Sequence, residues 1–107
     1  KWICPGGRLN LGESIRDGVL REVKEETDLD IELLEPFVPF ERVVKDDGGV
    51  SLHVIYIDYR ARLAGGELMP RDDVGEAVWM GRAELARRWG ELHEDTQRLL
   101  NLAGVAQ

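Results

Sequence analysis

The segment between Ser14 and residue 27 constrains the fold most, because its apolar residues recur at the spacing of one helix face. Ser14 is a residue type that caps helix N-termini, and Asp17 follows three residues later, as in a capping arrangement. The apolar positions are Ile15, Val19, Leu20 and Val23. The sequence therefore predicts an amphipathic helix from about residue 14 to residue 27.

Another side of this predicted helix carries three glutamates, Glu22, Glu25 and Glu26. They are spaced three and four residues apart, so their carboxylates are neighbours on the helix surface and destabilise it by roughly 0.2–0.5 kcal/mol per pair. A divalent cation would remove that repulsion, and Mg²⁺ and Mn²⁺ prefer carboxylate oxygens. Arg21, four residues before Glu25, is placed to orient that carboxylate.

The loop before the helix distinguishes this cluster from an ordinary solvated charged face, which is the usual interpretation of such residues. Pro5-Gly6-Gly7 is a turn signal, and the glycine pair lets the backbone approach an ion or a phosphate closely. Glu13 then stands at the start of the helix. A solvated face requires none of these features, so the pattern favours a functional site.

The spacing of these residues resembles the signature of the Nudix (MutT-like) hydrolase family. In that signature a Gly is followed after five residues by Glu, and after seven more by Arg-Glu and an apolar residue. After one further residue of any type comes a Glu-Glu pair, and after another comes a Gly followed by an apolar residue. The matching residues are Gly7, Glu13, Arg21, Glu22, Val23, Glu25, Glu26 and Leu29. Asp28 stands where the family has Gly. That Gly ends the helix in a left-handed conformation, which Asp tolerates at a cost of about 1 kcal/mol, so we expect this departure to affect stability more than chemistry.

The resemblance implies an Mg²⁺- or Mn²⁺-dependent hydrolase that cleaves the diphosphate linkage of nucleoside diphosphate-X compounds by water attack at phosphorus. The substrate would be a nucleotide sugar, an ADP-ribose-like compound or a nucleoside triphosphate. The implied catalytic residues are Glu22 as candidate general base, Glu25, and Arg21 and Glu13 as supporting and orienting residues. The implied metal ligands are Glu22, Glu25, Glu26 and the Gly7 carbonyl, or that of Gly6.

Residues outside the signature supply further candidates. Arg8 and Arg42 are candidate contacts to substrate phosphate. In this family an additional acidic base often comes from a distant loop, for which Asp72, Asp73 and Glu76 are candidates; a solvated acidic loop explains these three residues equally well.

Two alternative functions remain open at this point. The Trp2 to Arg8 segment also resembles the GDP-mannose mannosyl hydrolase branch, which attacks carbon, but that branch has an altered signature and this chain keeps Glu22, Glu25 and Glu26. The second alternative is a Nudix-like nucleotide-binding module without catalysis. Such modules typically lose signature glutamates, and this chain has lost none. We therefore favour the hydrolase that attacks phosphorus.

The remaining sequence predicts mixed strands and helices. Residues 30–45 are expected to be extended, residues 45–49 form a turn, and residues 50–63 form a long strand that is apolar on both faces and so covered on both. Short strands are expected at 2–4 and 77–80, and helices at 84–89 and 94–102. The resemblance implies an α+β fold, an α/β/α sandwich around a mixed sheet, in one domain over residues 1–107, with the family's N-terminal strand or strands missing.

The charge and composition limit the partners and the compartment. The formal net charge of −7 argues against duplex nucleic acid, which requires a basic face, but agrees with a small-molecule nucleotide held through metals. No apolar run approaches the roughly 18 residues of a membrane span, and no signal-peptide pattern opens the chain. The single cysteine, Cys4, fits a reducing cytoplasm. An incomplete sheet would expose an edge or apolar surface, so we expect a homodimer.

Overall fold

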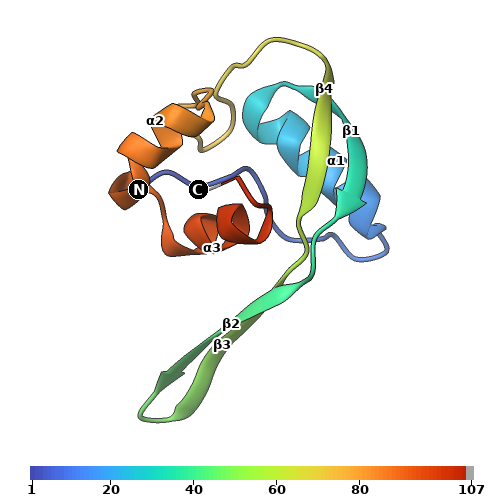
Figure 1. Cartoon of the computed structure of the whole chain (residues 1–107). Helices are drawn as coiled ribbons and strands as arrows, with labels where there is room; N and C mark the ends of the chain where they lie inside the picture. The colour runs from blue at the N-terminus through green and yellow to red at the C-terminus, as the bar shows by residue number, and fades with distance from the viewer. Residues whose placement is uncertain (106–107) are drawn as a thin grey trace.

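The computed structural model describes residues 1–105 and contains helices and antiparallel strands, which confirms the α+β class (Figure 1). The elements are α1 (Ile15–Thr27), β1 (Asp30–Pro36), β2 (Phe40–Asp46), β3 (Gly49–Tyr56), β4 (Tyr59–Gly65), α2 (Arg82–Arg87), a 3-10 turn (Trp89–Glu91) and α3 (Glu94–Leu102). None of the described helices is both long and apolar enough to cross a membrane.

Helix α1 forms where the sequence predicts it and carries the predicted cap. The hydroxyl of Ser14 accepts a hydrogen bond of 3.1 Å from the backbone N–H of Asp17. At the other end Asp28 adopts a left-handed conformation with φ 63° and ψ 16°, and its N–H donates to the Lys24 carbonyl. Asp28 therefore ends the helix as the family's glycine would, as the sequence predicts.

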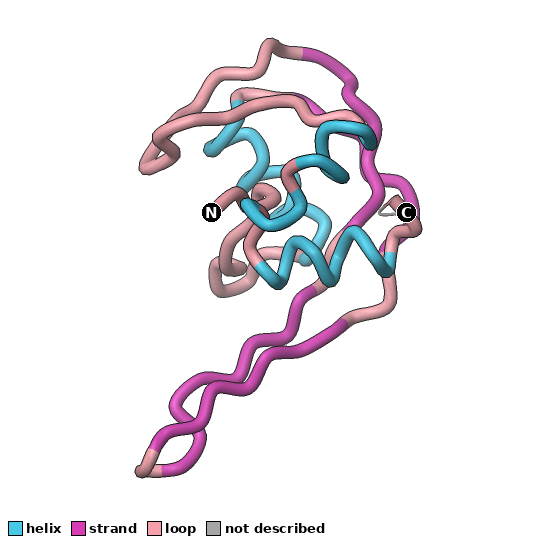
Figure 2. Tube along the Cα trace, turned by 60° about the vertical axis from the view of Figure 1, so that its left-hand side comes forward, coloured by secondary structure: helices cyan, strands magenta, loops and turns pink. Residues whose placement is uncertain are grey.

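The strands form two antiparallel pairs that follow one another along a bent ribbon. β1 pairs with β4 and β2 pairs with β3. The β2–β3 hairpin projects away from the rest of the molecule (Figures 1 and 2). The expected strand over 50–63 is therefore interrupted between Tyr56 and Tyr59, opposite Pro36 and Pro39. A proline lacks the N–H that a continuous ladder needs, so the pairing loses its register there.

The strand pairing also corrects the expected sheet. The described strands do not build one mixed sheet with helices on both faces, and the isolated parallel bridge joins Trp2 to Leu92. In that bridge the Trp2 N–H donates to the Glu91 carbonyl and the His93 N–H donates to the Trp2 carbonyl. The bridge stands in place of the strand expected over 2–4. Residues 77–80 form no strand, and the helix expected over 84–89 spans Arg82–Arg87 instead. A strand needs a neighbour for its backbone groups, which neither short segment has along its length.

The apolar core of the described residues is small and extends beyond the contact between α1 and β1 to the start of β2 and the segment before α3. Its buried apolar residues are Leu29, Leu33, Phe40 and Leu92. By contrast, Val50 and Ile55 of the hairpin are 60% and 65% exposed, so the expectation that this strand is covered on both faces is wrong for the described residues. The accessible surface is 7538 Å², against about 6,000 Å² expected for a compact monomer of 12.1 kDa.

Candidate functional site

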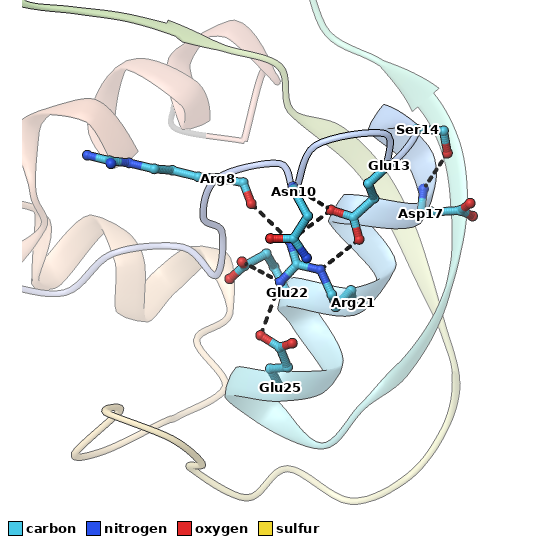
Figure 3. A network of polar contacts seen from close by, with 8 residues as sticks. All are labelled: Arg8, Asn10, Glu13, Ser14, Asp17, Arg21, Glu22 and Glu25. Carbon is cyan, nitrogen blue, oxygen red and sulfur yellow. Dashed lines mark hydrogen bonds and ion pairs between the residues drawn. The ribbon is translucent and has the colours of Figure 1, made fainter.

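Arg21 lies at the centre of a polar network that joins the loop before α1 to the helix (Figure 3). Its Nε donates to Glu13 Oε2 at 2.7 Å and its Nη2 donates to Glu13 Oε1 at 2.9 Å. Its Nη1 donates to Glu22 Oε1 at 2.8 Å and to Glu25 Oε2 at 3.2 Å. Nη2 also donates to the Arg8 carbonyl at 2.9 Å. A single guanidinium thus holds three signature carboxylates and the loop backbone.

The charges in this network stabilise one another. The hydrogen bond from Arg21, followed by that from the Asn10 N–H, lowers the pKa of Glu13 to about 2. The same carboxylate, followed by Glu22, raises the pKa of Arg21. Both groups are therefore ionised across the physiological pH range, and Glu13 acts on the helix through Arg21.

The glycine pair brings the loop backbone onto the glutamates of α1. The N–H of Gly6 donates to Glu26 Oε1 at 2.8 Å. A Cβ added at Gly7 would overlap the Glu22 carboxylate. The two glycines therefore lie directly beside the two glutamates, and at Gly7 only a glycine leaves room for that side chain.

An open cavity of about 400 Å³ lies beside these glutamates. It is lined by Ile3, Glu22, Glu26, Asp72, Asp73 and Val74. Burial is the largest influence that raises the pKa of Glu26, and the charges of Glu22, Asp72 and Glu25 raise it further, whereas the Gly6 N–H opposes the rise. Four carboxylates from two distant segments thus concentrate negative charge at one cavity, which favours a cation.

The donors at this cavity fit a hard divalent cation. Glu22 and Glu26 offer carboxylate oxygens, and the backbone of Gly7 lies against the Glu22 carboxylate. Within residues 1–105, no group of three or more His, Cys, Asp or Glu side chains is already gathered as a metal site. In the described structure Arg21 instead engages Glu22 and Glu25 with hydrogen bonds.

Comparison with known proteins agrees with this arrangement. The family model described as NUDIX domain matches residues 1–100. The chain belongs to the NUDIX domain family. Its relatives include a protein of Bacillus subtilis named as the uncharacterized Nudix hydrolase YvcI, 30% identical over 73% of this chain, and the protein named MutT4 of Mycobacterium tuberculosis, 32% identical over 95%. A further relative is the ADP-ribose pyrophosphatase of Methanocaldococcus jannaschii, 37% identical over 71%. The alignments span 49%, 40% and 43% of those proteins, so the chain covers less than half of the length of each.

The two candidate phosphate contacts of this Nudix chain do not lie together. Arg8 contributes its carbonyl to the Arg21 network, while its side chain extends away from that network (Figure 3). Arg42 lies on β2, and its Nη1 is 3.8 Å from Asp95 of α3. It does not line the cavity, because the hairpin that carries it projects away from α1 (Figure 1).

Some residues near the cavity carry no signal in the sequence that would mark them as part of a site. Ile3 and Val74 supply apolar lining, and no motif marks them. Arg71 also lies here, since its N–H donates to the Glu26 carbonyl at 3.1 Å. Its position directly before Asp72-Asp73 is the one signal that could have drawn attention to it. Of the three acidic loop candidates, Asp72 and Asp73 line the cavity, whereas Glu76 does not.

Proposed function

We propose that this chain hydrolyses the diphosphate linkage of nucleoside diphosphate-X compounds, with water attacking phosphorus. The observation that supports the proposal most is the cavity at which Glu22 and Glu26 of the Nudix signature meet Asp72 and Asp73 of a distant loop. A diphosphate is held there only if cations offset the negative charge of both partners, and carboxylates are the side chains that hold such cations.

The cation site is part of this proposal. Glu22, Glu25, Glu26 and the Gly7 carbonyl would hold Mg²⁺ or Mn²⁺. When bound, such an ion neutralises charge on phosphate oxygens and lowers the pKa of a bound water. Because Arg21 engages Glu22 and Glu25 in the described structure, metal binding would require these side chains to redistribute their contacts.

The chain's own residues have separate roles in the proposal. Glu22 accepts the proton from the attacking water as general base, because it lines the cavity and its position is fixed by Arg21 and Gly7. Glu25, also hydrogen-bonded to Arg21, completes the acidic face of α1. Glu13 and Arg21 position the other groups rather than react. Asp72 and Asp73 are the candidates for an additional base, as both reach the cavity.

The relatives support the substrate class. The M. jannaschii protein is named an ADP-ribose pyrophosphatase, so ADP-ribose is the first substrate to test, followed by a nucleotide sugar and a nucleoside triphosphate. We further propose that the chain acts in the cytoplasm, on small nucleotides and not on duplex nucleic acid, as a homodimer. The single cysteine supports a reducing compartment, and the net charge of −7 argues against duplex nucleic acid.

The test is hydrolysis of these three substrates with Mg²⁺ or Mn²⁺, before and after chelation. Glu26→Gln should lower turnover by more than about a hundredfold, since an outer-shell partner alone accounts for roughly 10- to 100-fold. Glu67→Gln is the matched control, because that exposed side chain lies outside the cavity and the Arg21 network. If the chain binds these nucleotides but shows no metal-dependent turnover, the hydrolase proposal fails and a non-catalytic nucleotide-binding module takes its place. In labelled water, label in the phosphate product supports attack at phosphorus, and label in the sugar supports the mannosyl hydrolase reaction.

A further inference from the structure

The loop that brings Asp72 and Asp73 to the cavity runs beside the last turn of α1. The N–H of Met69 donates to the Thr27 carbonyl at 3.0 Å, and the N–H of Arg71 donates to the Glu26 carbonyl at 3.1 Å. These are carbonyls of the last helical turn, which have no partner within the helix. The loop therefore donates hydrogen bonds to free carbonyls at the end of α1, and these bonds tie the position of the loop to that of the helix.

The side chain of Asp28 adds a contact that a glycine at this position could not make. Its Oδ1 accepts a hydrogen bond of 2.7 Å from Arg71 Nη1. The more distant Lys24 Nζ lies 3.7 Å from the same oxygen. Asp28 is also the residue at which this chain departs from the Nudix signature, so the contact belongs to this chain rather than to the signature.

The backbone at this junction leaves the loop little freedom. A Cβ added at Gly66 would lie 2.6 Å from the Asp28 carbonyl oxygen, so the chain after β4 crosses directly over the helix cap. Five residues later Arg71 reaches the Asp28 side chain, and the Val74 N–H donates to the Arg71 carbonyl at 3.0 Å. The turn between Arg71 and Val74 presents Asp72 and Asp73 to the cavity.

We propose that the Asp28–Arg71 ion pair is a positioning contact, which fixes the Asp72–Asp73 turn against Glu26 and thereby sets the affinity of the site for a divalent cation. This inference rests on the proposed function for its catalytic consequence, but not for its effects on the loop and on cation binding. Asp28, in place of the signature glycine, thus influences the candidate metal site as well as the end of the helix.

The pair is half-exposed, with 51% of the Arg71 side chain and 33% of the Asp28 side chain accessible. Exposed ion pairs contribute little to stability, so its loss should hardly change the melting temperature. Asp28→Gly separates the effect on stability from the effect on loop position most clearly. It removes the ion pair and also the strain of a left-handed Asp, so the melting temperature should stay equal or rise while the positioning is lost.

The variants are Asp28→Asn, Asp28→Gly, Arg71→Gln, Arg71→Lys and the double Asp28→Asn/Arg71→Gln. Glu35→Gln and Arg60→Gln are matched controls, because they break an ion pair of the same 2.7 Å length between β1 and β4. Three quantities are measured: amide exchange of Met69 and Arg71, Mn²⁺ affinity by paramagnetic resonance, and kcat and KM on ADP-ribose.

We expect faster exchange at both amides, Mn²⁺ affinity lower by about tenfold, and a fall in kcat larger than the change in KM for both Asp28 variants and for Arg71→Gln. Arg71→Lys should retain most of the parent's Mn²⁺ affinity, and the double variant should be no worse than either single one. Exchange rates and Mn²⁺ affinities equal to those of the controls would overturn the inference, as would independent, additive losses. Absence of turnover in the parent would instead contradict the proposed function and leave the first two measurements decisive.

Discussion

Arg21 and Glu13 face each other through two parallel hydrogen bonds, Nε to Oε2 at 2.7 Å and Nη2 to Oε1 at 2.9 Å. This fork geometry matches a planar guanidinium to a carboxylate and holds the loop before α1 in one orientation. The remaining donor nitrogen of Arg21 is then directed at Glu22 and Glu25. The pair therefore connects the loop to the acidic face of the helix.

The pH dependence of folding should reveal this pair. Because Arg21 lowers the pKa of Glu13 from its ordinary value of 4.5 to about 2, the carboxylate contributes stability above pH 4.5 that is lost as the pH falls towards 2. Glu13→Gln should therefore lower the melting temperature near neutral pH and make the acid side of its pH profile shallower. Thermal melts across that range check this, with Glu67→Gln as the control. An acid profile as steep as the parent's would contradict it.

The two adjacent glycines should respond differently to alanine. A Cβ at Gly7 would displace the Glu22 carboxylate, whereas a Cβ at Gly6 meets nothing within 4 Å. Gly7→Ala should lower Mn²⁺ affinity and turnover by about tenfold to a hundredfold, because displacing a reacting group by about 1 Å has effects of that size. Its stability should change little, since a flexible carboxylate can move aside. If Gly6→Ala and Gly7→Ala had the same Mn²⁺ affinity and turnover, the position of Glu22 would not depend on its contact with Gly7.

Gly66 should be a stability determinant. It has φ +85°, and a Cβ there would lie 2.6 Å from the backbone oxygen of Asp28, which cannot move without the helix end. Gly66→Ala should destabilise the fold by about 1–3 kcal/mol. In a domain of this size each kcal/mol lowers the melting temperature by roughly 4–8 °C. Gly75→Ala, where a Cβ meets nothing within 4 Å, is the matched control, and chemical denaturation measures both. A Gly66→Ala variant as stable as Gly75→Ala would refute the steric argument.

The exposed apolar surface should drive self-association. Leu11 and Val38 are 107% and 75% exposed, and Val50 and Ile55 of the hairpin are also largely accessible. Such surface is stabilised by burial at about 25 cal/mol per Å², so we expect a homodimer that persists at high salt. Light scattering coupled to size exclusion measures the mass. A monodisperse species of 12.1 kDa at micromolar concentration would contradict the prediction.

Helix α1 shows how far sequence reasoning reaches. Its extent, the Ser14 cap and the left-handed Asp28 all follow from interactions within a few residues, and the structure confirms each. The predicted apolar face is confirmed only in part, because Ile15 and Leu20 are 39% and 37% exposed. The long strand over 50–63 was harder to predict, because its interruption depends on the prolines of the opposite strand. The same holds for its exposed faces, which depend on what packs against them and not on the strand itself.

The candidate site divides in the same way. Glu22, Glu25 and Glu26 could be placed together from the sequence because α-helix geometry is fixed over four residues. The arrival of Asp72 and Asp73 at the cavity could not, since 45 residues lie between Glu26 and Asp72. Nor could the separation of Arg42 from that cavity, which follows from the direction of the hairpin.

The sequence by itself therefore determined the helix, its acidic face and the family, because these depend on local spacing and on the identity of a few residues. Only the tertiary structure decided which loop reaches Glu26 and how Asp28 is used. Those outcomes depend on hydrogen bonds from Met69 and Arg71 to the end of α1, and on the ion pair between Asp28 and Arg71. Contacts between residues far apart in the chain form only when the intervening strands bring them together, and no local pattern encodes that path.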